Sequence, residues 1–415
     1  MRGWLLSVFL VLLSACTVGP DYVQPDIETP ERWSVDISAA EDLTDTAWWT
    51  RFGDPVLDRL VERAVRRNLD LKIATARIDQ FIGQLEVARA EALPRVDGAV
   101  SIGTGRSGGQ STESIQATLN SQWEIDLWGR IRRANEAARA RLIGSKAGRR
   151  AVLMTLVSNV AGSYVTLRGL DRQLAIARQS AQAYAESLDL MRLRYEYGAI
   201  SQLELRQAES LLESARQAIP RFESLVRQQE NLLAVLLGDL PGAIPRGREI
   251  DRLTPPAIPA GLPSTLLERR PDILQAEQAL VAANAEIGVA RAAYFPTISL
   301  TGLLGSVSGE LDGLFSGGTG QSSLAGGLAA PLLNWGAIAG QVAQAESLQQ
   351  QALFQYQQTL LNAFREVEDA LVKTIKGREE AAARQTQTRI LNDVASLARL
   401  RFDGGTTDYL QVLDA

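Results

Sequence analysis

The side chains that carry most enzyme chemistry are nearly absent from this 415-residue chain, which has no histidine and one cysteine, Cys16. Histidine-based acid–base catalysis, the usual zinc sites and internal disulfides are therefore excluded. Lys and Arg number 43 against 48 Asp and Glu, and the net charge of −5 argues against a dedicated nucleic-acid binder. No phosphate loop, carboxylate pair or metal-ligand spacing occurs. The sequence predicts a protein that is not an enzyme and needs no cofactor.

Cys16 is the one position where covalent chemistry is expected. It follows Arg2 and an apolar run from Trp4 to Leu13, which is shorter than the roughly 20 residues that span a bilayer. A charged start and a small residue at the end are typical of a secretory signal. Ala15-Cys16 resembles the bacterial lipobox, in which the cysteine is diacylated, and two acyl chains suffice for stable anchoring. Thr17 stands where an aspartate would retain a lipoprotein at the inner membrane, so the outer membrane is expected. The alternative is an ordinary signal with an incidental cysteine.

The chain contains an internal repeat. Ala88-Arg89-Ala90 with Pro94 recurs as Ala290-Arg291-Ala292 with Pro296, an offset of 202 residues. Trp128-Gly129 recurs as Trp335-Gly336, an offset of 207 residues. The change of offset arises between Pro94 and Trp128, where both copies are rich in Gly and Ser, so exposed loops are expected there. Two structural repeats are therefore predicted.

Each repeat is predicted to contain a very long helix that turns and runs back. No proline occurs from Gly129 to Tyr195, and apolar residues follow one another at steps of three or four if Ser163 is counted as a weak member. This pattern is typical of a coiled-coil seam, and such a helix is roughly 100 Å long. The returning helix keeps the same spacing, and Pro220 should bend it. The expected seam of the long helix is Leu153, Leu156, Val160, Ser163, Leu167, Leu170, Leu174, Ala177, Ala181, Tyr184, Leu188, Met191 and Tyr195.

Four strands are predicted before and between the long helices. Apolar and polar residues alternate strictly from Ile115 to Ile125, which is the period of a strand with one apolar and one polar face. Weaker candidates are Val96 to Thr104, Pro296 to Leu304 and Leu324 to Trp335. Four strands cannot close a membrane barrel, so a barrel would have to be shared between chains. Aromatic residues at the strand ends suggest an interfacial girdle, whereas the alternative is a soluble sheet with core aromatics: Trp123, Trp128, Tyr294, Phe295 and Trp335.

The whole chain resembles the TolC-like outer-membrane factor family, in the lipoprotein branch that serves tripartite RND efflux systems (NodT-type outer membrane efflux lipoproteins). The resemblance implies a homotrimer in which four strands per chain build one 12-stranded outer-membrane barrel, and in which the helices form a periplasmic tunnel. It also implies a periplasmic adaptor (membrane fusion) protein and an inner-membrane pump as partners. The residues that carry it are the lipobox, Trp48-Trp49, Phe52-Gly53-Asp54-Pro55, Arg270-Pro271-Asp272, Phe295-Pro296 with Ile298-Ser299-Leu300, Trp335-Gly336 and Val412-Leu413-Asp414-Ala415.

The resemblance assigns roles to the tips of the helical hairpins. In the family, the tips form the periplasmic entrance and meet the adaptor. The alternative is two ordinary helix–helix turns with incidental arginines. Asp414 stands where the entrance narrows to an acidic ring; a solvated surface aspartate is the alternative, and Gln207 is its counterpart in the first repeat. The positions that match the adaptor-contacting tips are Arg194, Gly198, Leu203, Arg401, Gly405 and Leu410.

The fold expected is mainly α with a small β part, in which antiparallel coiled-coil hairpins occur in two repeats. The function expected is the exit duct of an efflux system, which passively conducts drugs or other small molecules. A lipid-anchored coiled-coil protein that scaffolds the envelope without transport is the alternative. Compared with the first repeat, the second lacks about thirty residues of its return helix. The expected segments are 1–15 signal peptide, 16–54 lipid-anchored lead-in, 55–238 first repeat (helices 55–93 and 129–238, strands 94–128), 239–263 Pro-rich connector and 264–415 second repeat (strands 296–335).

Overall fold

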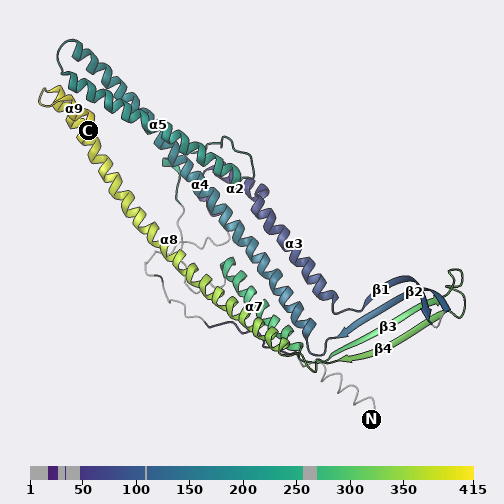
Figure 1. Cartoon of the computed structure of the whole chain (residues 1–415). Helices are drawn as coiled ribbons and strands as arrows, with labels where there is room; N and C mark the ends of the chain where they lie inside the picture. Colours follow the sequence, from purple (N-terminus) through teal and green to yellow (C-terminus); the bar gives the residue numbers. More distant parts are fainter. Residues whose placement is uncertain (1–16, 27–32, 34–46, 108–109, 256–268) are drawn as a thin grey trace. The chain divides into compact units, whose positions relative to one another are not determined.

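The structure is a computed structural model that describes residues 17–26, 33, 47–107, 110–255 and 269–415 (Figure 1). Long helices dominate these residues, and a single four-stranded sheet accompanies them. The elements are η1 (Trp48–Phe52), α2 (Pro55–Arg67), α3 (Leu69–Ala90), β1 (Arg95–Ser107), β2 (Gln110–Ile125), α4 (Arg130–Glu196), α5 (Gln202–Leu236), η2 (Ile250–Arg252), α7 (Pro271–Ala292), β3 (Thr297–Ser308), β4 (Gly320–Ala329), α8 (Ala337–Asp403) and α9 (Tyr409–Asp414).

The chain divides into two compact units. The first, which we call the sheet unit, comprises Met1–Thr29, Ala74–Arg150 and Leu266–Ala363. The second, the hairpin unit, comprises Pro30–Ile73, Ala151–Thr265 and Phe364–Ala415. Helices α3, α4 and α8 contribute residues to both units. Each unit is described by itself below.

The sheet is antiparallel throughout, in the order β1-β2-β3-β4 (Figure 1). Directly paired residues lie on the same face of such a sheet. Because Val100 pairs with Ala117, Leu119 with Leu304, and Ile298 with Leu328, the apolar positions of all four strands fall on one side, which we call the apolar face. Its members are Val96, Val100, Ile102, Ile115, Leu119, Trp123, Ile125, Ile298, Leu300, Leu304, Leu324 and Leu328.

The opposite face is mainly polar, so the alternation expected for Ile115 to Ile125 extends across the sheet. It carries Gln116, Thr118, Asn120, Gln122, Ser299, Thr301, Gln321 and Ser323, although Leu303 and Val307 interrupt it.

The apolar face is not covered within the described chain: Val100 is 74% exposed, and Leu328 is 71% exposed. A soluble sheet buries its apolar face as a core, so the soluble alternative does not fit these exposures.

The first residues after Cys16 form a strap along the sheet unit. The Val18 amide donates to the Trp128 carbonyl, the Asn284 side chain donates to the Pro20 carbonyl, and the buried Arg133 guanidinium contacts Asp21 at 2.7 Å. Gly19 has φ +105°, and a Cβ on it would lie 2.5 Å from the Gly288 Cα. Only glycine fits this crossing.

The hairpin unit is organised by the packing of α5 alongside α4 (Figure 1). Leu156, Val160 and Leu167 of α4 lie in one buried cluster with Val226 and Leu233 of α5. Most of the expected seam is confirmed, and Pro220 lies inside α5 as expected. The seam differs from expectation at two places. Tyr164, rather than Ser163, is fully buried, and Tyr195 is 42% exposed at the end of the helix.

Two expected boundaries are wrong. The strand expected from Leu324 to Trp335 runs from Gly320 to Ala329. Pro331 has no N–H to donate to a ladder, which ends the strand, and Trp335 turns with a φ of 50°. The first helix, expected over 55–93, is two helices, α2 and α3, which are separated at Asn68. Asn68 donates its side-chain amide to the Leu236 carbonyl and accepts from the Leu71 amide, so it caps α3 while it binds the end of α5.

The predicted fold class is confirmed: the described chain is mainly helical, with a long hairpin of α4 and α5, a second long helix, α8, that is followed by the short α9, and four strands. None of the described helices combines the length and apolar character of a bilayer-spanning helix.

Candidate functional site

The two hairpin tips have the same backbone geometry. Gly198 and Gly405 both have φ +70°, the left-handed conformation that ends a helix. In the first tip the Gly198 amide donates to the Tyr195 carbonyl, and the next amide donates to the Arg194 carbonyl. In the second tip the Gly405 amide donates to the Phe402 carbonyl, and the next amide donates to the Arg401 carbonyl. The two tips, which are equivalent positions of the internal repeat, therefore form the same pair of backbone hydrogen bonds.

The two tips contact each other within the hairpin unit. The Arg194 guanidinium lies over the Phe402 ring at 4.6 Å and near the Tyr409 ring at 5.9 Å. Phe402 and Tyr409 pack edge to face at 4.9 Å, and the Tyr409 hydroxyl donates to the Ser187 hydroxyl. Tyr409 and Leu413 of α9 also pack on a buried cluster of α4 and α5 that comprises Leu188, Met191, Ala208 and Leu212. Arg194 is thus held by aromatic rings of its own chain.

The other predicted tip residues are mostly on the surface. Leu203 is 67% exposed, and Arg401 and Gly405 are exposed. The backbone of Leu410 lies in α9, and its side chain is outside the description. Asp414 is the last residue of α9 and is exposed, next to the packed Leu413. Ser201 begins α5 with a capping box, in which its hydroxyl accepts from the Glu204 amide while the Glu204 carboxylate accepts from the Ser201 amide.

Cys16 lies outside the described residues, but the strap that begins at Thr17 is described. The strap reaches Trp128, whose ring stacks on Phe295 at 4.6 Å and whose indole N–H donates to the Pro296 carbonyl at 2.8 Å. Two sequence motifs far apart in the chain, Trp128-Gly129 and Phe295-Pro296, therefore meet beside the sheet. Any group attached to Cys16 lies one residue from this strap.

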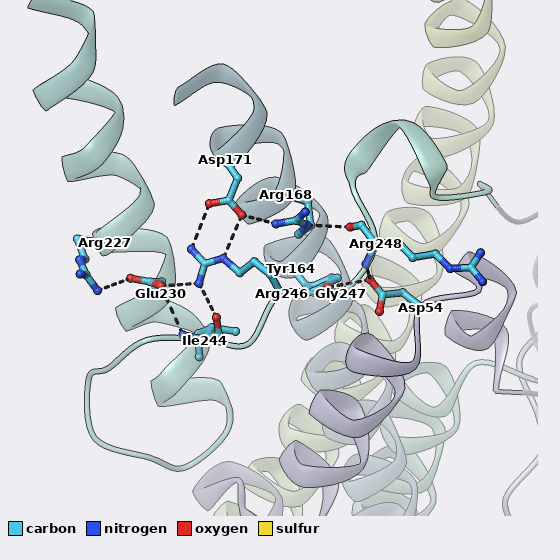
Figure 2. Close-up of polar contacts among 10 residues, drawn as sticks. All are labelled: Asp54, Tyr164, Arg168, Asp171, Arg227, Glu230, Ile244, Arg246, Gly247 and Arg248. Atoms are coloured by element: carbon cyan, nitrogen blue, oxygen red, sulfur yellow. Dashed lines mark hydrogen bonds and ion pairs between the residues drawn. The ribbon is translucent and has the colours of Figure 1, made fainter. Parts of the chain in front are cut away.

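A polar network that sequence reasoning missed holds the Pro-rich connector to the hairpin unit (Figure 2). Asp54 is fully buried and begins α2: its Oδ1 accepts from the Val56 amide, and its Oδ2 accepts from the Tyr164 hydroxyl at 2.7 Å and the Arg248 amide at 2.8 Å. Gly247 also donates its amide to the Tyr164 hydroxyl. A Cβ on Gly247 would lie 2.0 Å from the Asp54 carboxylate, so the connector must have glycine at this point.

Arg246 completes this network. Its guanidinium contacts Asp171 through two hydrogen bonds of 3.0 and 3.1 Å and also donates to the buried Glu230 (Figure 2). Arg168 donates to Asp171 at 2.6 Å and to the Arg248 carbonyl at 2.9 Å. Charges that are taken out of water must be paired, and here one connector arginine bridges carboxylates of α4 and α5. The network joins α2, α4, α5 and the connector.

The network shifts the pKa values of its members. Burial alone raises the pKa of Asp54, but the hydrogen bonds from Tyr164 and backbone amides outweigh burial, and the net pKa is lowered. Glu230 behaves likewise, because Arg246 outweighs its burial. Burial and the Asp54 carboxylate raise the pKa of Tyr164 to about 12. A local signal for Asp54 does exist in the sequence, since Asp before Pro is typical of a helix start. Nothing local marks Tyr164, Asp171 or Arg246.

Comparison with known proteins places these features in a family. The profile of the outer membrane efflux protein family matches residues 60–239 and 262–415. The cation efflux system protein CusC of Escherichia coli is 33% identical over 412 residues, which cover 97% of this chain and 90% of CusC. The probable outer membrane lipoprotein SilC of Salmonella typhimurium is 32% identical over 419 residues, covering 99% of this chain and 91% of SilC.

A solved structure gives the same result for the fold. The open state of the Neisseria gonorrhoeae MtrE outer membrane channel matches with a TM-score of 0.89 and 32% identity, covering 96% of this chain and 91% of that chain. The two proteins share helical hairpins and strands over nearly their whole lengths.

The first prediction from this site concerns Asp54. Asp54→Asn replaces an acceptor with an amide that cannot accept from all its donors, so we expect a loss of about 1–3 kcal/mol in unfolding free energy. Tyr164→Phe should lower the free energy of unfolding by a similar amount.

The same network predicts that stability depends on pH. The pKa values of Asp54 and Glu230 are lowered in the folded protein, so the stabilisation that these carboxylates give is present above their unfolded pKa values. It is lost as the pH falls through the folded pKa values, below about pH 4. Denaturant unfolding at several pH values measures both effects.

The matched control is Glu213→Gln, which removes a carboxylate from an exposed ion pair with Arg216. Such pairs contribute less than about 1 kcal/mol. If Glu213→Gln and Asp54→Asn lower the stability equally, the buried network does not hold the connector.

The second prediction concerns the contact between the tips. Arg194→Ala removes the cation–π contact, which is worth about 0.5–1 kcal/mol at exposed sites. The amides of α9 should then exchange with solvent about 2–5-fold faster, as measured by hydrogen exchange. Arg192→Ala is the control, because Arg192 is a neighbouring arginine whose ion pair with Asp189 is exposed. Unchanged exchange in Arg194→Ala would show that α9 is held by Tyr409 and Leu413 alone.

Proposed function

Because the chain belongs to the outer membrane efflux protein family, we propose that it is the exit duct of a tripartite efflux system. It passively conducts small molecules from an inner-membrane pump and a periplasmic adaptor to the exterior, and it catalyses no reaction. The observation that carries this proposal is the sheet, with one apolar and one polar face and with β1 and β4 each paired on one side only among the described strands. Lipid fits the apolar face, and a water-filled lumen fits the polar face.

The duct is formed by three copies of the chain. In lipid every backbone N–H and C=O must be paired, so the free edges of β1 and β4 must meet other strands. Four strands per chain give a closed barrel of 12 strands in a trimer, which is the assembly that the family resemblance implies. Trp123, Tyr294 and Trp335, which lie by the strand ends and are 37%, 50% and 89% exposed, then belong to the interfacial girdle.

Cys16 carries the lipid, and residues 1–15 are the signal that is removed. The strap from Thr17 to Tyr22 supports this assignment, because it holds the start of the mature chain against Trp128, beside the aromatic girdle. An acyl chain attached there starts at the height of the membrane interface. A close relative, SilC, is also described as a probable lipoprotein.

The hairpin tips form the periplasmic entrance and contact the adaptor. Leu203, Arg401 and Gly405 are exposed and available for this role. Arg194, Gly198 and Leu410 take part through the same turns, in which Arg194 also ties the two tips together. The connector over 239–263 is attached to the first helical repeat, 55–238, through the ion pairs of Arg246 with Asp171 and Glu230.

Asp414 is the constriction of the duct. Its backbone is in α9, which packs on the tip cluster, and its side chain faces solvent. Three such carboxylates around one axis repel one another and attract cations, so the narrowest point is selective for cations. Gln207, the counterpart in the first repeat, carries no charge.

The test is single-channel current across a planar bilayer. We expect the protein to conduct, because three sheets enclose an aqueous lumen, and we expect Asp414→Ala to raise the conductance and reduce the cation preference. Divalent cations should block the parent channel more strongly than the variant, since they bind between carboxylates.

Gln207→Ala is the control for Asp414→Ala, because it shortens the equivalent residue without a change of charge. Equal effects of the two substitutions on ion preference would remove Asp414 from the constriction. No current from an assembled protein would instead favour a lipid-anchored scaffold of the envelope.

A further inference from the structure

A groove between α3 and α4 lies beside the start of the sheet, within the sheet unit. The two helices are joined there by Asn135, whose side-chain amide donates to the Ala88 carbonyl (Figure 1). The groove has a volume of about 520 Å3, which is in the range of ligand pockets. Its floor is apolar, because Leu85 and Ile131 are buried in it, whereas its rim carries arginine and carboxylate side chains.

The groove adjoins the apolar face of the sheet. Trp123, a member of that face, donates its indole N–H to the Ala92 carbonyl at 3.0 Å, and Ala92 lines the groove. Val96, at the start of β1, is a second member of that face and is 62% exposed. Tryptophan at the edge of a lipid-facing surface is typical of the level of the headgroups. The groove therefore lies at headgroup level if the apolar face lies in lipid, so the inference below rests on the proposed function.

The strap is next to this groove. Arg133 of α4 pairs with Asp21 of the strap at 2.7 Å and with Glu136 at 2.8 Å, and Glu136 lines the groove. The strap begins one residue after Cys16, the expected lipid anchor. Two separate contacts, one through Trp123 and one through Arg133, thus connect the groove to parts of the chain that belong at a membrane surface.

One guanidinium in the groove has no partner. Arg139 is exposed and makes no ion pair or hydrogen bond with any residue that the structure describes. Arg89 and Arg132 line the same groove and pair with Glu86 and Asp126, but their side chains remain 50% and 41% exposed. Asp126 also accepts from two backbone amides at the start of α4, so that helix end is already capped. A phosphate matches such guanidinium groups, because it accepts two parallel N–H bonds from one arginine.

A purely anionic ligand does not fit the whole groove, because Glu136 also lines it. The Oε2 atom of Glu136 accepts from Arg133 at 2.8 Å, and its Oε1 atom accepts from no side chain or amide of the described residues. Glu136 lies three residues before Arg139 on α4, so the two Cβ atoms are about 5–6 Å apart on one side of the helix. The ligand that fits has a phosphate for Arg139 and, close to it, a positive group with N–H donors for Glu136.

We propose that this groove binds the headgroup of a phospholipid that carries a primary ammonium group. Its phosphate is bound by Arg139 and the neighbouring arginines, and its ammonium group is bound by Glu136. The acyl chains run over Trp123 and Val96 onto the apolar face, where they take the place of other lipid. A soluble phosphate ester has no chains to cover this apolar surface, so lipid is the occupant.

Lipid binding to the assembled protein tests this site. The protein is titrated in detergent with phosphatidylethanolamine, and native mass spectrometry gives the apparent Kd of the bound lipid. Arg139→Gln removes the unpaired charge at an exposed position, where the fold does not depend on it. We expect the variant to bind about tenfold more weakly, since it loses a hydrogen bond between charged groups.

Arg150→Gln is the matched control. Arg150 is exposed, lies on the same side of α4 and makes no ion pair or hydrogen bond with the described part of the chain. It lies three helical turns beyond Arg139, roughly 16 Å further along the helix and outside the groove. Equal losses of affinity in Arg139→Gln and Arg150→Gln would show that lipid does not occupy the groove.

The choice of headgroup tests the role of Glu136. We expect the parent protein to bind phosphatidylethanolamine more tightly than phosphatidylcholine, whose ammonium group has no N–H, and more tightly than phosphatidylglycerol, which has no ammonium group. Glu136→Gln should remove the preference for phosphatidylethanolamine over phosphatidylcholine, because the charged acceptor is lost. A parent protein that binds phosphatidylglycerol more tightly than phosphatidylethanolamine would contradict this assignment.

Two further measurements separate the other outcomes. Glycerophosphoethanolamine has the same headgroup without acyl chains, and if it binds as tightly as the lipid, the groove takes a soluble ligand instead. Insertion of the parent protein into liposomes is measured as well. A parent that does not insert contradicts the proposed function, whereas a parent that inserts, and whose lipid binding is unchanged by Arg139→Gln, contradicts the lipid site alone.

Discussion

A strand edge that enters lipid must find a partner, because no water is present there to bind its N–H and C=O groups. The sheet of this chain has an apolar face suited to lipid and, among the described strands, two edges that lack partners. Most other features follow from this constraint. The chain is built of two similar halves, each with one β-hairpin and one long helix, α4 or α8. Within the described chain the two β-hairpins meet at the pairing of β2 with β3.

The long helices of the hairpin unit depend on a second constraint. A long helix stays regular only if an apolar stripe is covered along its length, and α5 covers the α4 stripe through Leu156, Val160 and Leu188. Two of the polar contacts within the hairpin unit join segments that are far apart in the sequence through an arginine. Arg246 pins the connector to α4 and α5, and Arg194 joins the two tips. The first network is largely buried, whereas the second is a weaker, partly exposed contact at the hairpin tips, which form the entrance in the proposed duct.

Sequence patterns predicted the elements whose stabilising contacts are periodic. The α4 seam and the alternation of β2 depend on residues that are close together in the sequence, and the repeat offsets predicted two structural repeats. Contacts between distant residues were not predicted. Tyr164 is buried because its hydroxyl reaches Asp54, 110 residues earlier, and Gly247 is required by the same carboxylate. The end of β4 was misplaced because Leu324, Leu328 and Leu332 continue the apolar spacing, although Pro331, which has no N–H for a ladder, interrupts the strand after Ala329.

The central claim is that each chain supplies four strands of a closed barrel of twelve, so that three chains are needed to close it. Native mass spectrometry of the protein extracted from outer membranes in detergent measures this directly, because it counts the chains in each particle. The account predicts particles of three chains, in which twelve strands leave no free edge. Particles of one chain, or of an even number of chains, would contradict it.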